Sequence, residues 1–169
     1  MWYVIQVYSG REKYCENLIR NHVERQLMDE CRFPRYLEPR KKDGIWVSEE
    51  RILFPGYIFI KSNYIEDLFF QLKRVPRMTK ILRMEEAFIP LNAAEEAFIM
   101  QFTNEDQVVE VSKGVIQNKK VKVLSGPLVG YEGLIRKVDR HKRYAWLDIP
   151  FGEGKNINVR VGLEIIKAI

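Results

Sequence analysis

The chain has 169 residues, of which 46% are hydrophobic and 12% aromatic, so it can bury a real core as one domain or as two small ones. It has no apolar run of about 18 residues and no leader-like N-terminus, which excludes a membrane span and a signal peptide and predicts a cytoplasmic protein. The net charge of +5 is uneven. Residues 113–169 carry twelve Lys and Arg against five Asp and Glu, whereas residues 1–112 carry sixteen against eighteen. A basic C-terminal part points to nucleic acid, with a plain solvated face as the alternative.

The first part of the chain alternates between strand and helix patterns. Residues 2–9, WYVIQVYS, are apolar on both faces and predict a central strand. From Arg11 the apolar residues take helical spacing, which predicts an amphipathic helix of about 16 to 20 residues with Cys15 on its apolar face. Around the charged turn RKKDG the pattern predicts four short strands, at residues 32–39, 45–49, 51–54 and 56–62.

Two further helices are marked by capping signals. Asn63, three residues before Glu66, predicts the start of one helix, and Asn92 followed by Glu95 predicts the start of the last. Residues 79–84, TKILRM, predict a strand between them. The first domain is therefore expected to be an α+β sheet with two or three helices.

Beyond residues 103–107 the helical period ends. Short alternating segments separated by glycine turns follow, which predicts a small antiparallel β-barrel. Its strands are expected at residues 119–124, 132–138, 144–149 and 156–161. The expected organisation is a first domain at 1–103, a linker at 104–113 and a barrel at 114–169.

Catalytic and metal-binding patterns are absent from the sequence. It contains no nucleophile elbow, phosphate-binding loop or zinc-protease motif. The two cysteines, Cys15 and Cys31, and the two histidines, His22 and His141, do not have the spacing of a zinc site. We therefore expect a binding protein with no catalytic residues, no metal and no cofactor, and we expect both cysteines to be reduced thiols.

The segment RILFPGYIFIK, residues 51–61, holds a cluster of aromatic residues. Pro55 and Gly56 do not fit a regular strand, so a bend there presents Phe54, Tyr57 and Phe59 around a kink. Two interpretations remain open. The rings fill the core, or they form an exposed patch that docks another protein.

The segment IRKVDRHKRYAWLDI, residues 135–149, gathers the positive charge. A short hairpin with this many cations can contact several phosphates at once, and arginine can also bond bidentately and stack on bases. Tyr144 and Trp146 share one face, for which core packing is favoured over base stacking. The residues of the hairpin expected to contact nucleic acid are Arg136, Lys137, Arg140, His141, Lys142 and Arg143.

Three motifs in order, WYVIQVYSG, LFPGYIFI and VKVLSGPLVGYEG, resemble the NusG family of transcription elongation factors over nearly the whole chain. The resemblance implies an α+β N-terminal NGN domain, an antiparallel sheet flanked by helices, followed by an SH3-like β-barrel KOW domain. It also implies that the NGN domain binds the clamp of RNA polymerase through an apolar patch. The residues that match this patch are Tyr8, Phe54, Tyr57 and Phe59.

The hairpin is acidic or mixed in general NusG proteins, so its basic character here is a departure from them. The segment VPRMTK is a second departure. The stretch DRHKR instead resembles the specialised LoaP-type antiterminators, which implies that the KOW domain binds a structured leader RNA hairpin. Glycines and β-branched residues disfavour the helical storage of this domain seen in RfaH-type relatives, so we expect a permanent barrel. We add Lys120 and Lys155 to the hairpin residues as expected RNA contacts.

Two other functions remain as alternatives. A general NusG factor binds Rho or a ribosomal protein through a loop matching IPFGEG, where Phe151 is the counterpart. A ribosome-associated RNA-binding protein would use the barrel alone and leave the first domain unexplained. In each case we expect a monomer with no membrane partner.

Overall fold

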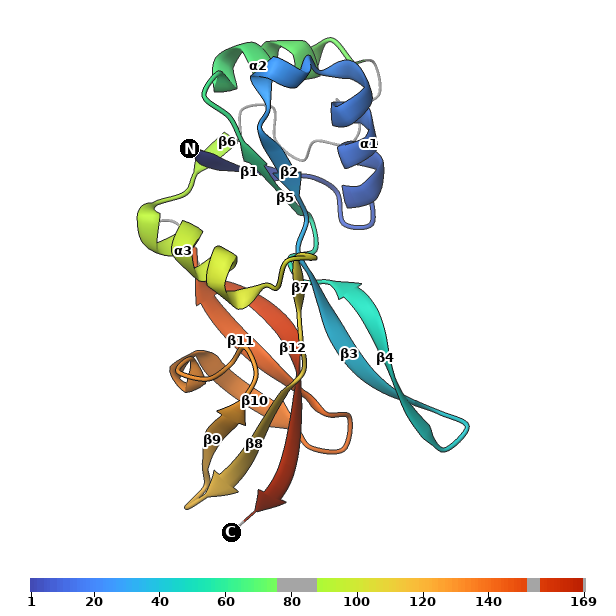
Figure 1. The fold of residues 1–169 in the computed structure, drawn as a ribbon, viewed down its shortest axis with the longest axis vertical. Coiled ribbons are helices and arrows are strands. Elements are labelled where there is room, and N and C mark those ends of the chain that lie inside the picture. Colours follow the sequence, from blue (N-terminus) through green and yellow to red (C-terminus); the bar gives the residue numbers. More distant parts are fainter. Residues whose placement is uncertain (76–87, 152–155, 169) are drawn as a thin grey trace. The chain divides into compact units, whose positions relative to one another are not determined.

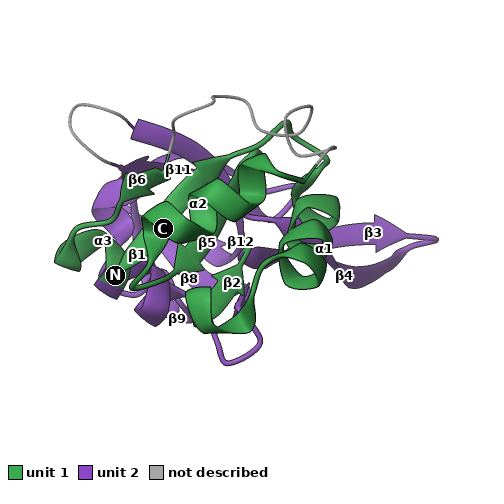
Figure 2. Cartoon of the chain, turned by 90° about the horizontal axis from the view of Figure 1, so that it is seen from above, with its two compact units in different colours: residues 1–33, 54–96 green, residues 34–53, 97–169 purple. Residues whose placement is uncertain are grey.

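The computed structural model describes residues 1–75, 88–151 and 156–168. The chain folds into two compact units, coloured separately in Figure 2. Unit 1 comprises residues 1–33 and 54–96, and unit 2 comprises residues 34–53 and 97–169. Residues 34–53 therefore belong to the same unit as the C-terminal part, although they lie within the N-terminal part of the sequence.

Unit 1 is built on a four-stranded sheet in the order β2-β5-β1-β6. Strand β1 pairs antiparallel with both β5 and β6 (Figure 1). The elements of unit 1 are β1 (Trp2–Gln6), α1 (Glu12–His22), the 3-10 turn η1 (Arg25–Leu27), β2 (Glu30–Arg32), β5 (Tyr57–Lys61), α2 (Ile65–Lys73) and β6 (Phe88–Pro90). Helix α3 (Ala93–Phe102) spans the boundary between the two units.

The core of unit 1 joins the helices to one face of the sheet. Helix α1 contributes Cys15 and Ile19, and β5 contributes Ile58 and Ile60, all of them fully buried. The period of the apolar residues in α1 is what turns these side chains to one side. Both cysteines are buried free thiols, as the sequence predicts.

The bend of the segment LFPGYIF is held by Glu12. Its buried carboxylate accepts hydrogen bonds from the backbone N–H of Gly10 at 3.0 Å and of Gly56 at 2.7 Å. Gly56 has a φ of 88°, and an added Cβ there would lie 3.1 Å from the carbonyl oxygen of Val7. Glycine is therefore required at this bend by both backbone conformation and space.

Several sequence predictions for this part need correction. Helix α1 has 11 residues and ends at His22 because Val23 is extended, so it is shorter than predicted. Asn63 does not cap α2: the helix begins at Ile65 with Tyr64 at the N-cap position, and no side chain among the described residues supplies a cap.

The capping prediction for α3 is confirmed. Glu95 N–H donates to Asn92 Oδ1, and Asn92 N–H donates to a carboxylate oxygen of Glu95, both at 2.9 Å. The strand predicted at residues 79–84 lies outside the described residues.

Unit 2 contains two sheets, ordered β4-β3-β7 and β10-β11-β12-β8-β9. The second sheet occupies the region predicted as a barrel. Its strand β12 pairs antiparallel with β11 but parallel with β8. The prediction of a wholly antiparallel barrel is therefore wrong at this one pairing. The elements are β3 (Arg35–Lys42), β4 (Ile45–Ile52), β7 (Val108–Val109), β8 (Ser112–Gln117), β9 (Lys120–Ser125), η3 (Glu132–Leu134), β10 (Ile135–Asp139), β11 (Tyr144–Pro150) and β12 (Asn156–Ala168).

Strands β3 and β4 form one long hairpin, visible in Figure 1. Asp43 and Gly44 form its turn with φ values of 51° and 79°, as in the type I′ turns that match the twist of paired strands. Strand β4 is continuous from Ile45 to Ile52, where the sequence predicts two short strands. The register pairs Arg35 with Ile52 and continues to the turn without a shift.

The hairpin approaches the barrel sheet at Gly162 of β12. A Cβ at this position would lie 2.7 Å from the carbonyl oxygen of Leu37 and 3.2 Å from Cδ of Pro39, both in β3. A distance below 3 Å to a backbone atom leaves no room for a side chain. The absence of a Cβ at Gly162 therefore lets β3 lie against β12 within unit 2.

Candidate nucleic-acid interface

The turn between β10 and β11 presents exposed positive charge. Asp139 Oδ1 accepts a hydrogen bond from the backbone N–H of Lys142 at 2.9 Å, and Arg143 closes the turn with a left-handed φ of 58°. Arg140, His141 and Lys142 are all exposed between these two points. The local hydrogen bond holds the backbone of the turn, so their side chains start from a fixed position.

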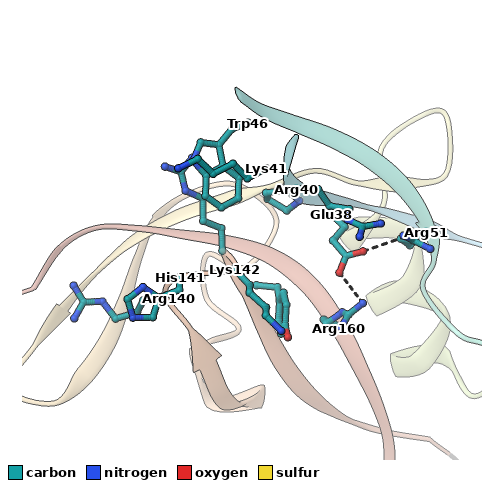
Figure 3. Close-up of a pocket in the computed structure, with 12 residues that line it drawn as sticks. Glu38, Arg40, Lys41, Trp46, Arg51, Arg140, His141, Lys142 and Arg160 are labelled. Atoms are coloured by element: carbon teal, nitrogen blue, oxygen red, sulfur yellow. Dashed lines mark ion pairs between the residues drawn. The ribbon is translucent and has the colours of Figure 1, made fainter. Parts of the chain in front are cut away.

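This turn forms a pocket of about 720 Å³ together with the β3–β4 hairpin (Figure 3). In Figure 3, Arg40, Lys41 and Trp46 of the hairpin lie on one side and the β10–β11 turn on the other. We call this site the basic pocket. Its lining residues are Glu38, Pro39, Arg40, Lys41, Trp46, Arg51, Arg140, His141, Lys142, Arg143, Tyr144 and Arg160. Seven of the twelve are Lys or Arg, and one is acidic.

The acidic residue, Glu38, is buried and fully engaged. One carboxylate oxygen is 2.6 Å from Arg160 Nη2, and the other is 3.1 Å from Arg51 Nε. Burying a carboxylate is unfavourable unless it is paired, and here two guanidinium groups pair it. The carboxylate therefore joins β3 to β4 and β12 and does not compete for a bound ligand.

Arg160 also organises the aromatic residues of unit 2. Its Nε donates to the hydroxyl of Tyr36 at 3.1 Å, and its guanidinium lies 4.5 Å from the ring centre of Tyr144 and 5.4 Å from that of Trp146. Tyr144 is 9% exposed. The predicted core packing is therefore confirmed for Tyr144, whereas Trp146 is only partly buried, and one guanidinium is the partner of both rings.

Burial and charge shift the titration of this group. Burial raises the pKa of Tyr36, and the hydrogen bond and charge of Arg160 oppose that effect only in part. Burial acts to lower the pKa of Arg160, but the hydrogen bond to Tyr36 and the negative charge of Glu38 outweigh it, so its pKa is raised. Arg160 thus stays charged and Tyr36 stays protonated around neutral pH.

Arg143 links the turn to the tip of the hairpin. Its guanidinium lies 3.9 Å from the ring centre of Trp46, and its Nη1 is 3.7 Å from a carboxylate oxygen of Glu164. A guanidinium over an indole face is an attractive contact. Residues that are remote in the sequence are thus in contact across the basic pocket.

The remaining cations of the basic pocket differ in how far they are neutralised. Arg40 is 3.2 Å from Glu49, whose pKa is lowered by hydrogen bonds from Lys42 and Arg40. Within residues 1–75, 88–151 and 156–168, no ion pair neutralises Lys41, Arg140 or Lys142. These three charges are available to an anionic ligand.

The other predicted RNA contacts lie elsewhere. Arg136 pairs with Asp148, whose pKa is lowered by hydrogen bonds from Asn158 at 2.9 Å and from Arg136. Lys137 and Lys120 are exposed but do not line the basic pocket. Lys155 lies outside the described residues.

The residues that the β3–β4 hairpin contributes to the basic pocket were not predicted from the sequence. Arg40, Lys41, Trp46 and Arg51 belong to a segment interpreted only as two strands and a charged turn. A signal was present, because three consecutive cations precede the Asp-Gly turn and a tryptophan follows it. What the sequence alone did not indicate was that this hairpin packs with the C-terminal part of the chain.

Of the four residues matched to the polymerase-binding patch, two fill the core and two reach the surface. Phe54 and Phe59 are each 1% exposed, and their rings pack together with centroids 5.3 Å apart. Tyr8 is 53% exposed and Tyr57 is half-buried, so these two reach the surface. In the segment VPRMTK, every residue after Val75 lies outside the described residues.

Phe151, the expected protein-docking residue, is also buried, at 6% exposed. A buried ring cannot contact a partner without leaving the core, so an anchoring role for Phe151 does not fit this structure. Among the residues that the structure describes, no three metal-ligating side chains come together, and no helix is long and apolar enough to cross a membrane.

The sequence of the chain matches known proteins along most of its length. Residues 1–100 match the family model described as transcription termination factor nusG, and residues 117–153 match the KOW motif. The transcription termination/antitermination protein NusG of Helicobacter pylori is 29% identical over 165 residues, which cover 94% of this chain and 93% of that protein. The corresponding protein of Neisseria meningitidis is 25% identical over 147 residues, covering 82% and 81%.

A solved structure, reported for domain interaction in Thermotoga maritima NusG, has the same fold. It aligns with a TM-score of 0.50 at 19% identity and covers 95% of this chain and 92% of that one. The predicted α+β fold, with an NGN domain followed by a KOW domain, is confirmed. The relatives are named as termination and antitermination proteins, and proteins of the matched family are transcription factors that are not enzymes. The chain belongs to the NusG family of transcription elongation and antitermination factors.

Proposed function

We propose that this protein is a LoaP-type antiterminator that binds a structured leader RNA in its basic pocket while its NGN domain binds RNA polymerase. One observation carries the RNA part of the proposal. Among the described residues, seven Lys and Arg line a pocket whose one carboxylate is already paired twice. A surface of this kind attracts a polyanion and offers it little repulsion.

Arginine and lysine have different roles in such a site. Arg140 can hold a phosphate with two parallel hydrogen bonds, and Lys41 and Lys142 act as point charges on neighbouring phosphates. Because these cations extend from two hairpins, they can contact phosphates on more than one side of a folded RNA. That arrangement favours an RNA with a defined shape over an extended strand.

We assign polymerase binding to the region at 1–103, apart from its β3–β4 hairpin, and RNA binding to the KOW domain at 114–169 together with that hairpin, with 104–113 as the linker. The exposed Tyr8 and the half-buried Tyr57 are the candidate contacts to the polymerase clamp. Holding both partners on one chain raises the effective concentration of the RNA near the polymerase, so a modest RNA affinity is enough. The protein then stays with the polymerase through terminators in a long operon.

A general NusG factor with Rho or the ribosome as the partner of its KOW domain is the alternative. It is less favoured for two reasons. Its expected anchor, Phe151, is buried, and a protein contact does not require the unpaired cations Lys41, Arg140 and Lys142.

The test is binding of the full-length protein to a pool of labelled structured and unstructured RNAs over a range of salt concentrations. Each substitution that removes a cation from a phosphate should reduce the slope of log K against log salt by about 1. Arg140→Ala/Lys142→Ala should therefore reduce the slope by about 2 for the preferred hairpins. Lys113→Ala/Lys167→Ala removes the same charge from exposed positions outside the basic pocket and should leave selectivity for hairpins intact.

The proposal is overturned if all RNAs bind alike and both double variants weaken binding equally. In that event the positive charge is a general electrostatic aid, and the general NusG function with protein partners becomes the better account.

A further inference from the structure

Trp46 is placed unusually for a tryptophan. It lies on β4 close to the Asp43-Gly44 turn, where both neighbours are exposed, Ile45 at 67% and Val47 at 37%. The indole itself is only partly buried, and it lines the basic pocket. Its ring meets the guanidinium of Arg143 at 3.9 Å. A large ring held at the edge of a charged pocket by one cation has little role in packing a core.

A planar, partly exposed ring beside unpaired cations suits a nucleobase. Aromatic side chains bind unpaired bases by stacking, while nearby cations hold the flanking phosphates. The volume of the basic pocket, about 720 Å³, falls in the range of about 300–1,000 Å³ that is usual for sites of small ligands. A site of this volume accommodates one nucleotide.

The charged groups around Trp46 have partners that allow a base to bind there. Arg143 is also held by Glu164 at 3.7 Å, so it has a partner of its own if a base displaces it from the indole. Glu38, the one carboxylate in the lining, is neutralised by Arg51 and Arg160. An acidic peptide would satisfy the cations equally well but would leave the ring of Trp46 without a planar partner.

We propose that the basic pocket takes one unpaired base of the bound RNA, stacked on Trp46, with the phosphates beside it held by Lys41, Arg140 and Lys142. This inference rests on the proposed function and specifies its ligand. The preferred RNA is a hairpin that carries an extruded nucleotide, and a fully paired stem is a poorer ligand. Any of the four bases can stack, so the site reads the presence of an unpaired base more than its identity.

The experiment compares three labelled stem-loop RNAs that share one stem and one loop. The first is fully paired in its stem, the second has one unpaired adenosine, and the third has an abasic ribose at that position. Fluorescence anisotropy with the full-length protein should show about 5- to 150-fold tighter binding of the second RNA than of the third, which is the range that one stacked base contributes.

Three variants test the role of Trp46 itself. Trp46→Ala should bind the three RNAs alike, whereas Trp46→Phe should keep most of the preference because it retains a ring. Ile45→Ala is the matched control, because this neighbouring residue is exposed and does not line the basic pocket. Its preference should equal that of the wild-type protein. Circular dichroism of each variant checks that the fold is retained.

Different results would refute RNA binding in the basic pocket and base stacking on Trp46. If the three RNAs bind alike and Arg140→Ala/Lys142→Ala weakens all of them, the base site is refuted and RNA binding in the basic pocket stands. If none of the RNAs binds selectively at raised salt, RNA recognition itself is refuted. If polyglutamate displaces the adenosine-containing RNA as readily as unlabelled RNA does, the site is a general polyanion surface and the base site is refuted.

Discussion

Replacing Glu38 should lower the stability of unit 2 far more than replacing Glu50, although both glutamates form an ion pair of the same length. Glu38 is 2.6 Å from Arg160, and Glu50 is 2.6 Å from Arg35. Their exposure differs, because the side chain of Glu38 is 8% exposed and that of Glu50 is 49% exposed. The comparison therefore sets a buried carboxylate paired with two guanidinium groups against an exposed carboxylate paired with one, at the same shortest distance.

The magnitude follows from the exposure of the partners. Removing one member of a fully buried pair costs about 3–5 kcal/mol, and an exposed pair contributes about 0.2–1 kcal/mol. Arg160 and Arg51 are 31% and 46% exposed, so water can solvate them in part after Glu38 is lost. We expect Glu38→Ala to cost about 2–3 kcal/mol, between these limits, and Glu50→Ala to cost at most about 1 kcal/mol.

Hydrogen exchange followed by mass spectrometry is the suitable assay, because it reports on β11 and β12 separately from unit 1. At about 1.4 kcal/mol per factor of ten, Glu38→Ala should speed exchange in these strands about 30- to 150-fold, and Glu50→Ala about fivefold at most. Glu38→Gln keeps an acceptor oxygen and should fall between them. Equal effects of Glu38→Ala and Glu50→Ala would refute the reasoning that burial makes the Glu38 pair important.

Three further outcomes are expected. Burial raises the pKa of Cys15 and of Cys31 to about 12, so neither thiol should react with iodoacetamide at about pH 8 until the protein is unfolded; rapid labelling of the native protein would contradict their burial. Gly162→Ala should weaken RNA binding and increase exchange in β3, because its Cβ would strike a β3 carbonyl oxygen, whereas Gly133→Ala meets nothing within 4 Å and should change neither. In an NMR pH series, the carboxyl of Asp148 should titrate below the ordinary aspartate pKa of about 3.9. Its contribution to stability is therefore present above the ordinary pKa and is lost as the pH falls through the lower pKa of the folded state. A titration midpoint at or above the ordinary pKa would show that the hydrogen bonds of Asp148 do not form in solution.

Local patterns in the sequence predicted local structure well. The Asn92 and Glu95 pair gave the start of α3 because a capping box is complete within four residues. The alternation of apolar residues located β9, β10, β11 and β12 for the same reason, since each pattern is contained in its own segment, but it missed β8. Asn63 misled because the N-cap position of α2 falls one residue later, at Tyr64, and no side chain in the described part of the chain caps this helix.

Only the part of the basic pocket that the β10–β11 turn contributes could be predicted from the sequence. The charges of the β10–β11 turn are adjacent in the sequence, but the contact of Arg143 with Trp46 and the pair of Glu38 with Arg160 join residues that are remote in it. No pattern within a segment encodes such a contact. The burial of Phe59 was undecided for a related reason, because β5 is buried on both faces at its centre and alternation does not distinguish an exposed side.

The most direct test of RNA binding in the basic pocket is an amide chemical-shift map of the full-length protein, recorded while the tightest-binding hairpin of the RNA pool is added. The account predicts that the largest shifts fall at residues 38–51, at residues 139–144 and at Arg160, and so on both hairpins of unit 2 together. Shifts confined to the β10–β11 turn, shifts centred on other surfaces of the chain, or no shifts would contradict it.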